Sequence, residues 1–247
     1  MTHVHKITSI GTFHQNYCED YAFFRDIGEN RILISVMDGC TMGTEAYFAS
    51  ALIGKLLKKI SQEEFYLEYG SKQVLPIDEL LKKVLEKLFN QLKELKVFMQ
   101  LGRNELLSTI NLGIVDTQEK TGDFIVVGDG LIYMNDLYFE LDQDNQPDYI
   151  GYHLKENFED WWEDQDQFFS FENIEDITVS TDGIFTFSKY DNASYPEVEN
   201  HEVIKYLLND TSDIQNERMF EKKLHYIEKE WGLKSTDDLG IVRLILA

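Results

Sequence analysis

Acidic residues recur in this chain where segments with the character of β-strands begin or end. A glycine follows three of them, and an isolated Asp-Gly pair is ordinary turn chemistry, because Asp caps its own backbone and Gly accepts positive φ. A second interpretation is that the strand ends converge, so that the carboxylates crowd one rim and repel each other in a partly buried site. The positions are Asp20 with its neighbour Glu19, Asp38, Asp129, Asp182 and Asp237.

A crowded set of carboxylates is stabilised when a divalent cation offsets its charge. Carboxylate oxygens, together with backbone carbonyls exposed in small turns, suit Mg²⁺ or Mn²⁺. Zinc is disfavoured, because no spacing of histidines and cysteines in the sequence matches a zinc site. The sequence therefore favours a Mg²⁺ or Mn²⁺ centre, with solvated turn residues as the open alternative.

The elements that must position these residues begin with strands and a pair of helices. β-Branched and aromatic residues bounded by turn signals predict strands over 6–11, 21–25 and 31–37. Within the last of these, Ile32 to Val36 is almost continuously apolar, as in a strand buried on both faces. Apolar residues at helical spacing predict helices over 45–60 and 78–96.

Strands return in the second half of the chain. Four of them, expected to form one meander, are predicted over 109–115, 124–127, 131–134 and 137–141. The acidic and aromatic segment 142–176 is interpreted as an insertion of irregular or helical structure. Further strands are predicted over 177–180 and 241–246, and helices over 202–209 and 217–230. This order favours an α+β fold of antiparallel sheets covered by helices, because a parallel doubly wound fold alternates more regularly.

Composition narrows the functional classes. The 247 residues include 23 Lys and Arg against 45 Asp and Glu, which gives a formal net charge of -22. This charge disfavours nucleic acid and anionic membranes as partners, and no apolar run approaches the ~20 residues that span a bilayer. The absence of a linker-like segment favours one domain over 1–247. With no signal peptide and only two cysteines, a reducing, cytoplasmic setting is predicted.

Six ordered motifs, running from about Gly11 to Leu246, resemble those of the metal-dependent serine/threonine protein phosphatases of type 2C, especially bacterial members. The predicted helical pair lies between the second motif and the third, as in that family. The motifs are His14-Gln15-Asn16-Tyr17-Cys18-Glu19-Asp20, Val36-Met37-Asp38-Gly39-Cys40-Thr41-Met42-Gly43, Ser108-Thr109, Val127-Gly128-Asp129-Gly130, Ser180-Thr181-Asp182-Gly183-Ile184 and Thr236-Asp237-Asp238-Leu239-Gly240-Ile241-Val242.

The resemblance implies a four-layer α-β-β-α sandwich, in which two antiparallel sheets are flanked by helix pairs. It also implies two Mg²⁺ or Mn²⁺ ions and a third, more weakly held ion. By this resemblance Asp38 bridges the two ions and Gly39 binds one of them through its carbonyl. Asp182 and Asp237 complete the other ion's ligands.

Three more acidic residues receive roles in the same way. Asp20, together with Glu19, is expected to hold metal-bound waters, and Asp129 is expected to help hold the third ion. The implied reaction is hydrolysis of phosphoserine or phosphothreonine in proteins by a water that two metal ions activate. The phosphorylated protein is the implied partner, whereas the physiological substrate and the oligomeric state are not defined by the sequence.

The chain departs from the family pattern at three places. In the second motif, Thr41 and Met42 intervene before Gly43, so the second glycine of the family's Asp-Gly-x-Gly-Gly region is displaced. Gln15 stands where many members carry an arginine that grips the substrate phosphate, and the neighbouring His14 is a candidate replacement. Cys40 stands where many eukaryotic members place a histidine. These departures keep two alternatives open: a catalytically weak scaffold that binds phosphoproteins, and a small-molecule phosphomonoesterase. A cysteine phosphatase is disfavoured, because neither Cys18 nor Cys40 begins a Cys-x5-Arg loop.

Overall fold

The computed structural model describes residues 2–143, 147–191 and 194–246, which form two five-stranded antiparallel sheets. One sheet has the order β1-β12-β9-β6-β7 and the other has the order β2-β3-β4-β5-β8. The first sheet comprises β1 (Thr2–Ser9), β12 (Leu239–Leu246), β9 (Asp176–Ser180), β6 (Gly130–Met134) and β7 (Leu137–Leu141). The second comprises β2 (Tyr21–Gly28), β3 (Arg31–Met37), β4 (Ile110–Asp116), β5 (Thr121–Val127) and β8 (Phe168–Phe171).

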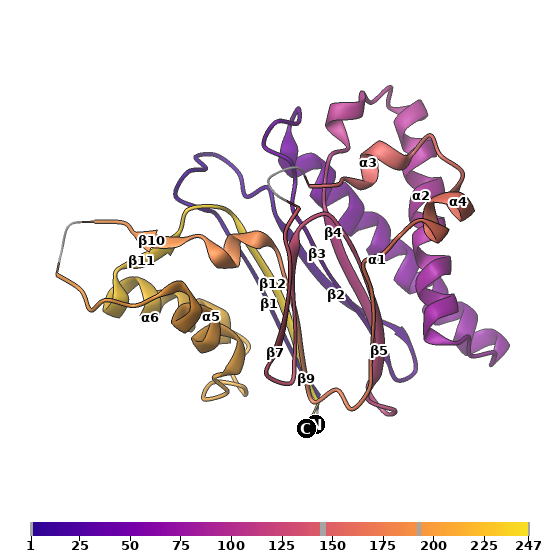
Figure 1. Cartoon of the computed structure of the whole chain (residues 1–247). Helices are drawn as coiled ribbons and strands as arrows, with labels where there is room; N and C mark the ends of the chain where they lie inside the picture. Colours follow the sequence, from indigo (N-terminus) through magenta and orange to yellow (C-terminus); the bar gives the residue numbers. More distant parts are fainter. Residues whose placement is uncertain (1, 144–146, 192–193, 247) are drawn as a thin grey trace.

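Helices cover the outer face of each sheet (Figure 1). Helices α1 (Ala46–Ser71) and α2 (Ile77–Phe98) pack on the second sheet, and α5 (Asn200–Asn209) and α6 (Met219–Tyr226) cover the first. The shorter elements are α3 (Ile150–His153), α4 (Phe158–Glu163), β10 (Phe187–Lys189), β11 (Leu233–Ser235), η1 (Arg103–Glu105), η2 (Asp182–Phe185) and η3 (Ile227–Trp231). No helix in the described ranges combines the length and the apolar character needed to cross a membrane.

Three apolar cores separate four layers, and they confirm the predicted α-β-β-α sandwich. The outer cores lie between each sheet and its helices, and the middle core lies between the two sheets. Strand β3 explains why its sequence is almost continuously apolar. Leu33 and Met37 face the helical core, whereas Ile34 and Val36 face the core between the sheets.

The predicted single meander is wrong, because its four strands belong to two sheets. Strands β4 and β5 pair in the second sheet, and β6 and β7 pair in the first. The chain crosses between the sheets at Gly128 and Asp129. Gly128 has φ +95°, a conformation that residues with a Cβ rarely adopt, so glycine permits this abrupt change of direction.

Two further elements differ from their predictions. Helix α1 continues to Ser71, well past the predicted end at Ile60, and Glu64 in this extension is buried against lysines of α2. The segment 142–176 contains the helices α3 and α4, and it also contains β8, which pairs with β5 at the edge of the second sheet. Trp161 of α4 is 2% exposed and packs against Phe89 of α2.

Candidate active site

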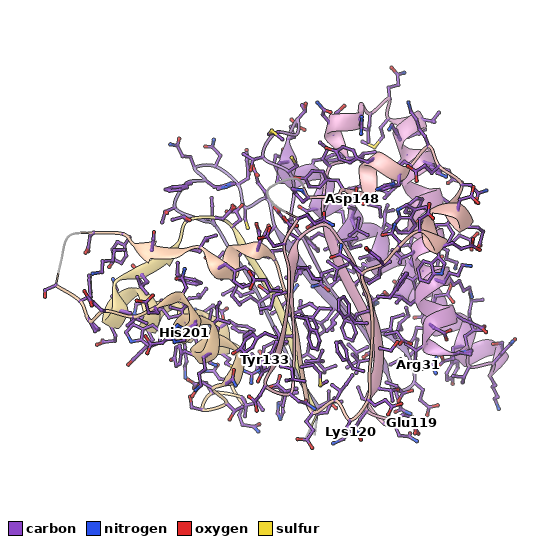
Figure 2. All side chains as sticks on the ribbon, in the orientation of Figure 1. Arg31, Glu119, Lys120, Tyr133, Asp148 and His201 are labelled. Carbon is purple, nitrogen blue, oxygen red and sulfur yellow. The ribbon has the colours of Figure 1, made fainter. Side chains whose placement is uncertain are left out.

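The acidic residues singled out by the sequence gather at one end of the sandwich. Asp38 follows β3, Asp182 follows β9, and Asp237 precedes β12. Both chain termini lie at the other end (Figure 1). Figure 2 shows Arg31, the first residue of β3, near that terminal end, so Asp38 lies beyond the opposite end of the same strand.

Electrostatic coupling shows that these carboxyl groups are close neighbours. Burial raises the pKa of Asp38 well above its ordinary value, and the charges of Asp20, Asp182 and Asp237 raise it further. Burial also raises the pKa of Asp182 to about 6, with contributions from the charges of Asp237 and Asp129. Asp20, Asp38, Asp182 and Asp237 therefore lie within electrostatic reach of one another.

Asp20 and Asp38 are the two carboxyls of this group that interact most directly with each other. Burial raises the pKa of Asp20 well above its ordinary value, and its carboxyl shares a hydrogen bond with that of Asp38. The Thr181 hydroxyl donates to Oδ2 of Asp20 at 2.6 Å, which partly offsets the cost of burial. Two neighbouring carboxyl groups repel each other when both are ionised, which is one cause of a raised pKa.

The backbone around Asp38 is fixed from two sides. The Asp38 N–H donates to Oγ1 of Thr109 at 3.1 Å, and the Thr109 N–H donates to the Asp38 carbonyl at 2.9 Å. The Gly39 N–H donates to the carbonyl of Glu19 at 3.2 Å. A Cβ on Gly39 would lie 2.2 Å from the carbonyl oxygen of Ala46, so only glycine fits this close approach.

Asp238 belongs to the sixth motif but received no role in the sequence analysis, and the structure places it beside this group. Its carboxylate is almost fully buried and accepts hydrogen bonds from the backbone N–H groups of Gly11 and Glu19, the first at 2.7 Å. It therefore ties the loop before β2 to the residues that lead into β12. Its position next to Asp237 in the sequence could have drawn attention to it, because a second carboxylate there needs hydrogen-bond partners of its own.

His14 lies among the carboxylates. Its Nε2 is 3.0 Å from Asp237, and its Nδ1 is 3.5 Å from Asp238 and 3.7 Å from Glu19. The Glu19 carboxylate also accepts a hydrogen bond from the Thr41 hydroxyl at 3.0 Å. The cationic form of His14 would offset part of the negative charge at this edge of the site.

Gln15 and Asp129 lie at the margins of the group. Gln15 lines a surface hollow beside His14. Asp129 lies between β5 and β6, accepts a hydrogen bond from the Gln143 N–H at 2.8 Å, and contributes to the raised pKa of Asp182. Asp129 is thus within electrostatic reach of Asp182.

The two cysteines are poor candidates for a nucleophile. Burial and the charge of Asp20 raise the pKa of Cys18 to about 12, so its thiolate is scarce at neutral pH. Cys40 is 5% exposed and packs with Leu107 and Tyr149. Neither environment activates a thiol.

The chemistry of the donor set fits an oxygen-preferring divalent cation. A bound cation would offset the charge of these carboxyls, whose pKa values are raised by burial and by one another. Within residues 2–143, 147–191 and 194–246, however, no three His, Cys, Asp or Glu side chains already form a group able to hold a metal ion.

Sequence comparison identifies a family. A family model described as Protein phosphatase 2C matches residues 11–227. The matched stretch contains Asp20, Asp38, Asp129 and Asp182, and it ends before Asp237. A comparison with curated proteins finds no match.

Solved structures share the fold at low sequence identity. The phosphatase domain, with a regulatory fragment, of the cell fate determinant SpoIIE from Bacillus subtilis has a TM-score of 0.59 and 18% identity, over 99% of this chain and 63% of that chain. A mutant bacterial serine phosphatase gives 0.66 and 14% identity, over 100% of this chain and 99% of the other. RsbX, solved in complex with magnesium, gives 0.56 and 14%, over 99% of this chain and 96% of RsbX.

Proposed function

Because the chain belongs to the protein phosphatase 2C family, we propose that it is a protein phosphatase. The proposed reaction is hydrolysis of phosphoserine and phosphothreonine in proteins, with Mg²⁺ or Mn²⁺. The observation that carries this proposal is the gathering of Asp20, Asp38, Asp182 and Asp237 around one end of the sandwich, where burial and neighbouring carboxylates raise the pKa values of Asp20, Asp38 and Asp182. Burying several carboxylates together costs free energy, and a bound cation is a ligand that would offset this cost.

Each acidic residue has a part in this proposal. Asp38 would bridge two ions, with the Gly39 carbonyl on one of them and Asp182 and Asp237 on the other. Asp129 would help hold a third, weaker ion. When bound, the ions lower the pKa of water and offset charge on the phosphoryl oxygens, so no protein nucleophile is required.

The protein's own contribution is to hold these ligands in place. Thr109 and Gly39 fix the backbone of Asp38, and Thr181 orients Asp20. Asp238 anchors the loop that carries Glu19, which together with Asp20 would order the water molecules of the site. A ligand set held by packed strand ends is more precisely arranged than one held on free loops.

The phosphate of the substrate would meet His14 and Gln15 at the edge of this group. In its protonated form His14 has a donor at both ring nitrogens, and Nε2 lies 3.0 Å from Asp237. The absence of the family arginine at Gln15 removes a bidentate grip on phosphate. We therefore expect a higher KM for simple phosphate esters than an arginine at this position would give.

Hydrolysis of p-nitrophenyl phosphate with and without Mn²⁺ tests the proposal. Asp182→Asn and Asp237→Asn should each lower turnover by at least about 100-fold, because each removes a proposed metal ligand. Asp166→Asn, an exposed residue between α4 and β8, is the matched control and should keep wild-type turnover.

Folding of each variant is checked by circular dichroism. Wild-type turnover in Asp182→Asn or Asp237→Asn would reject the proposed site. A wild-type protein that binds phosphopeptides without Mn²⁺-dependent turnover would favour the scaffold alternative. Turnover of p-nitrophenyl phosphate without turnover of any phosphopeptide would favour the small-molecule phosphomonoesterase.

A further inference from the structure

A hollow of about 340 Å³ opens beside the proposed catalytic carboxylates. Its walls come from the loop before β2 and from the segment that leads into α1. His14 and Glu19 belong both to this hollow and to the group around Asp237 and Asp238. A substrate whose phosphate is at the carboxylates would therefore present its neighbouring residues to the hollow.

The hollow carries more acidic than basic groups. Its described lining residues include the carboxylates Glu19 and Glu45, no lysine or arginine, and His14 as the one side chain that can become cationic. Glu45 is exposed and, within the described part of the chain, makes no side-chain hydrogen bond to the start of α1. Unlike the buried carboxylates nearby, Glu45 is available to a cation that enters from solvent.

Aromatic rings complete the walls. Tyr17 and Tyr47 stack with ring centroids 4.6 Å apart and planes inclined by 30°. Tyr17 is 62% exposed, and Phe13 on the same wall is 80% exposed. Aromatic faces beside carboxylates attract a guanidinium or ammonium group, because the ring quadrupole and the negative charge act in the same direction.

We propose that this hollow binds an arginine or lysine side chain of the phosphoprotein substrate, close in sequence to the phosphorylated residue. The inference rests on the proposed phosphatase function and adds a substrate class to it: phosphoproteins with a basic residue beside the phosphorylation site. Charge complementarity selects this occupant, since an acidic segment would be repelled and a purely apolar side chain would leave Glu45 unpaired.

Phosphopeptides that differ at one flanking position test the preference. Peptides with one central phosphoserine carry Arg, Ala, Leu or Glu at the flanking position, and the position is scanned on both sides. At the best position, kcat/KM for the Arg peptide should exceed that for the Ala peptide by about five- to tenfold. This factor corresponds to the summed free energies of a modest ion pair and a cation–π contact. The Glu peptide should be the poorest substrate.

Variants locate the preference. The Arg-to-Ala ratio should fall to about two- to threefold in Glu45→Gln, which leaves the aromatic faces in place, and should fall partly in Tyr47→Leu, which removes one of these faces. The matched control is Glu217→Gln, which removes the same charge from an exposed residue before α6 and should keep the full ratio. Each ratio is taken within one variant, so a general change in turnover does not affect it.

Binding separates this inference from the proposed function. Anisotropy of the labelled peptides with metal-free wild-type protein should show the same order of Kd values, and p-nitrophenyl phosphate with Mn²⁺ reports catalysis independently. A binding preference without catalysis would overturn the proposed function alone. Equal handling of Arg and Ala peptides, a preference for Leu, or a full ratio in Glu45→Gln would overturn the inference about the hollow.

Discussion

Single residues set how closely the backbone segments of the site approach one another. A Cβ on Gly183 would lie 1.7 Å from the carbonyl oxygen of Asp238, and one on Gly39 would collide with Ala46. Neither glycine has a left-handed φ. The Asp-Gly pairs at these two places therefore reflect close backbone packing and not the turn chemistry that such pairs usually indicate.

The cysteines offer a test at the same scale. The double variant Cys18→Ser, Cys40→Ser should keep Mn²⁺-dependent turnover within about tenfold of wild type, a barrier change of no more than ~1.4 kcal/mol. The reason is that Cys18 is held protonated by burial and by the charge of Asp20. Turnover of p-nitrophenyl phosphate is the measurement.

A covalent phosphocysteine, sought by mass spectrometry after rapid quenching, would contradict this expectation. Complete inactivation of a folded double variant would do the same. A moderate loss confined to Cys40→Ser would indicate a packing role, because Cys40 contacts Leu107 and Tyr149 beside Asp38.

At the scale of elements, a buried ion cluster joins the two long helices. Glu64 of α1 is 3% exposed, with Lys83 Nζ at 2.7 Å and Lys87 Nζ at 2.6 Å from its oxygens. Glu64→Gln should lower the free energy of unfolding by about 1–2 kcal/mol, because it leaves two partly buried ammonium groups short of a counter-charge. Urea denaturation measures this change.

Glu63 provides the matched control on the same helix. Its carboxylate is 41% exposed and lies 3.8 Å from Lys59 and 3.5 Å from Lys87. Glu63→Gln should change the free energy of unfolding by less than about 0.5 kcal/mol. Similar losses for the two variants would show that burial does not govern the strength of this cluster.

The local pattern of apolar residues predicted most of the helices and strands, because each of them packs on a core through an apolar face in its own sequence. Strand β3 and helix α2 are examples, since their periodicity follows directly from the cores that they contact. The sheet to which β6 belongs could not be predicted locally, because it depends on pairing with β9 more than 40 residues later. Strand β8 was missed for the same reason: its four residues are stabilised as a strand by β5.

In the candidate site, too, local sequence predicts some positions, whereas others depend on contacts between distant parts of the chain. Asp38 and Asp182 were predictable, since each lies directly after its strand. The role of Asp238 was not, because its hydrogen bond to Gly11 joins positions separated by 227 residues. The hollow beside Glu45 was also beyond prediction, since its two walls meet only after β2 and α1 have packed together.

At the scale of the whole molecule, the sandwich brings negatively charged side chains together in a buried site, where their mutual repulsion is strong. The net charge is -22, and the buried carboxyls at one end of the sheets come from both halves of the sequence. Folding brings these groups together and removes them from water, so their repulsion is a cost that the unfolded chain avoids. A bound cation would remove this cost only in the folded state.

The metal-free protein should therefore lose stability as the pH rises from about 4 to 7. Asp182 has a pKa of about 6 when folded against ~3.9 in an unfolded chain, so the folded state binds more protons in this window. Asp182→Asn should raise Tm at pH 7.5 by several degrees without metal and flatten its pH dependence. Mn²⁺ should raise the wild-type Tm and have a smaller effect on the variant. Differential scanning fluorimetry in EDTA and in Mn²⁺ measures all four values, and a metal-free variant less stable than wild type would show that repulsion at this site is minor.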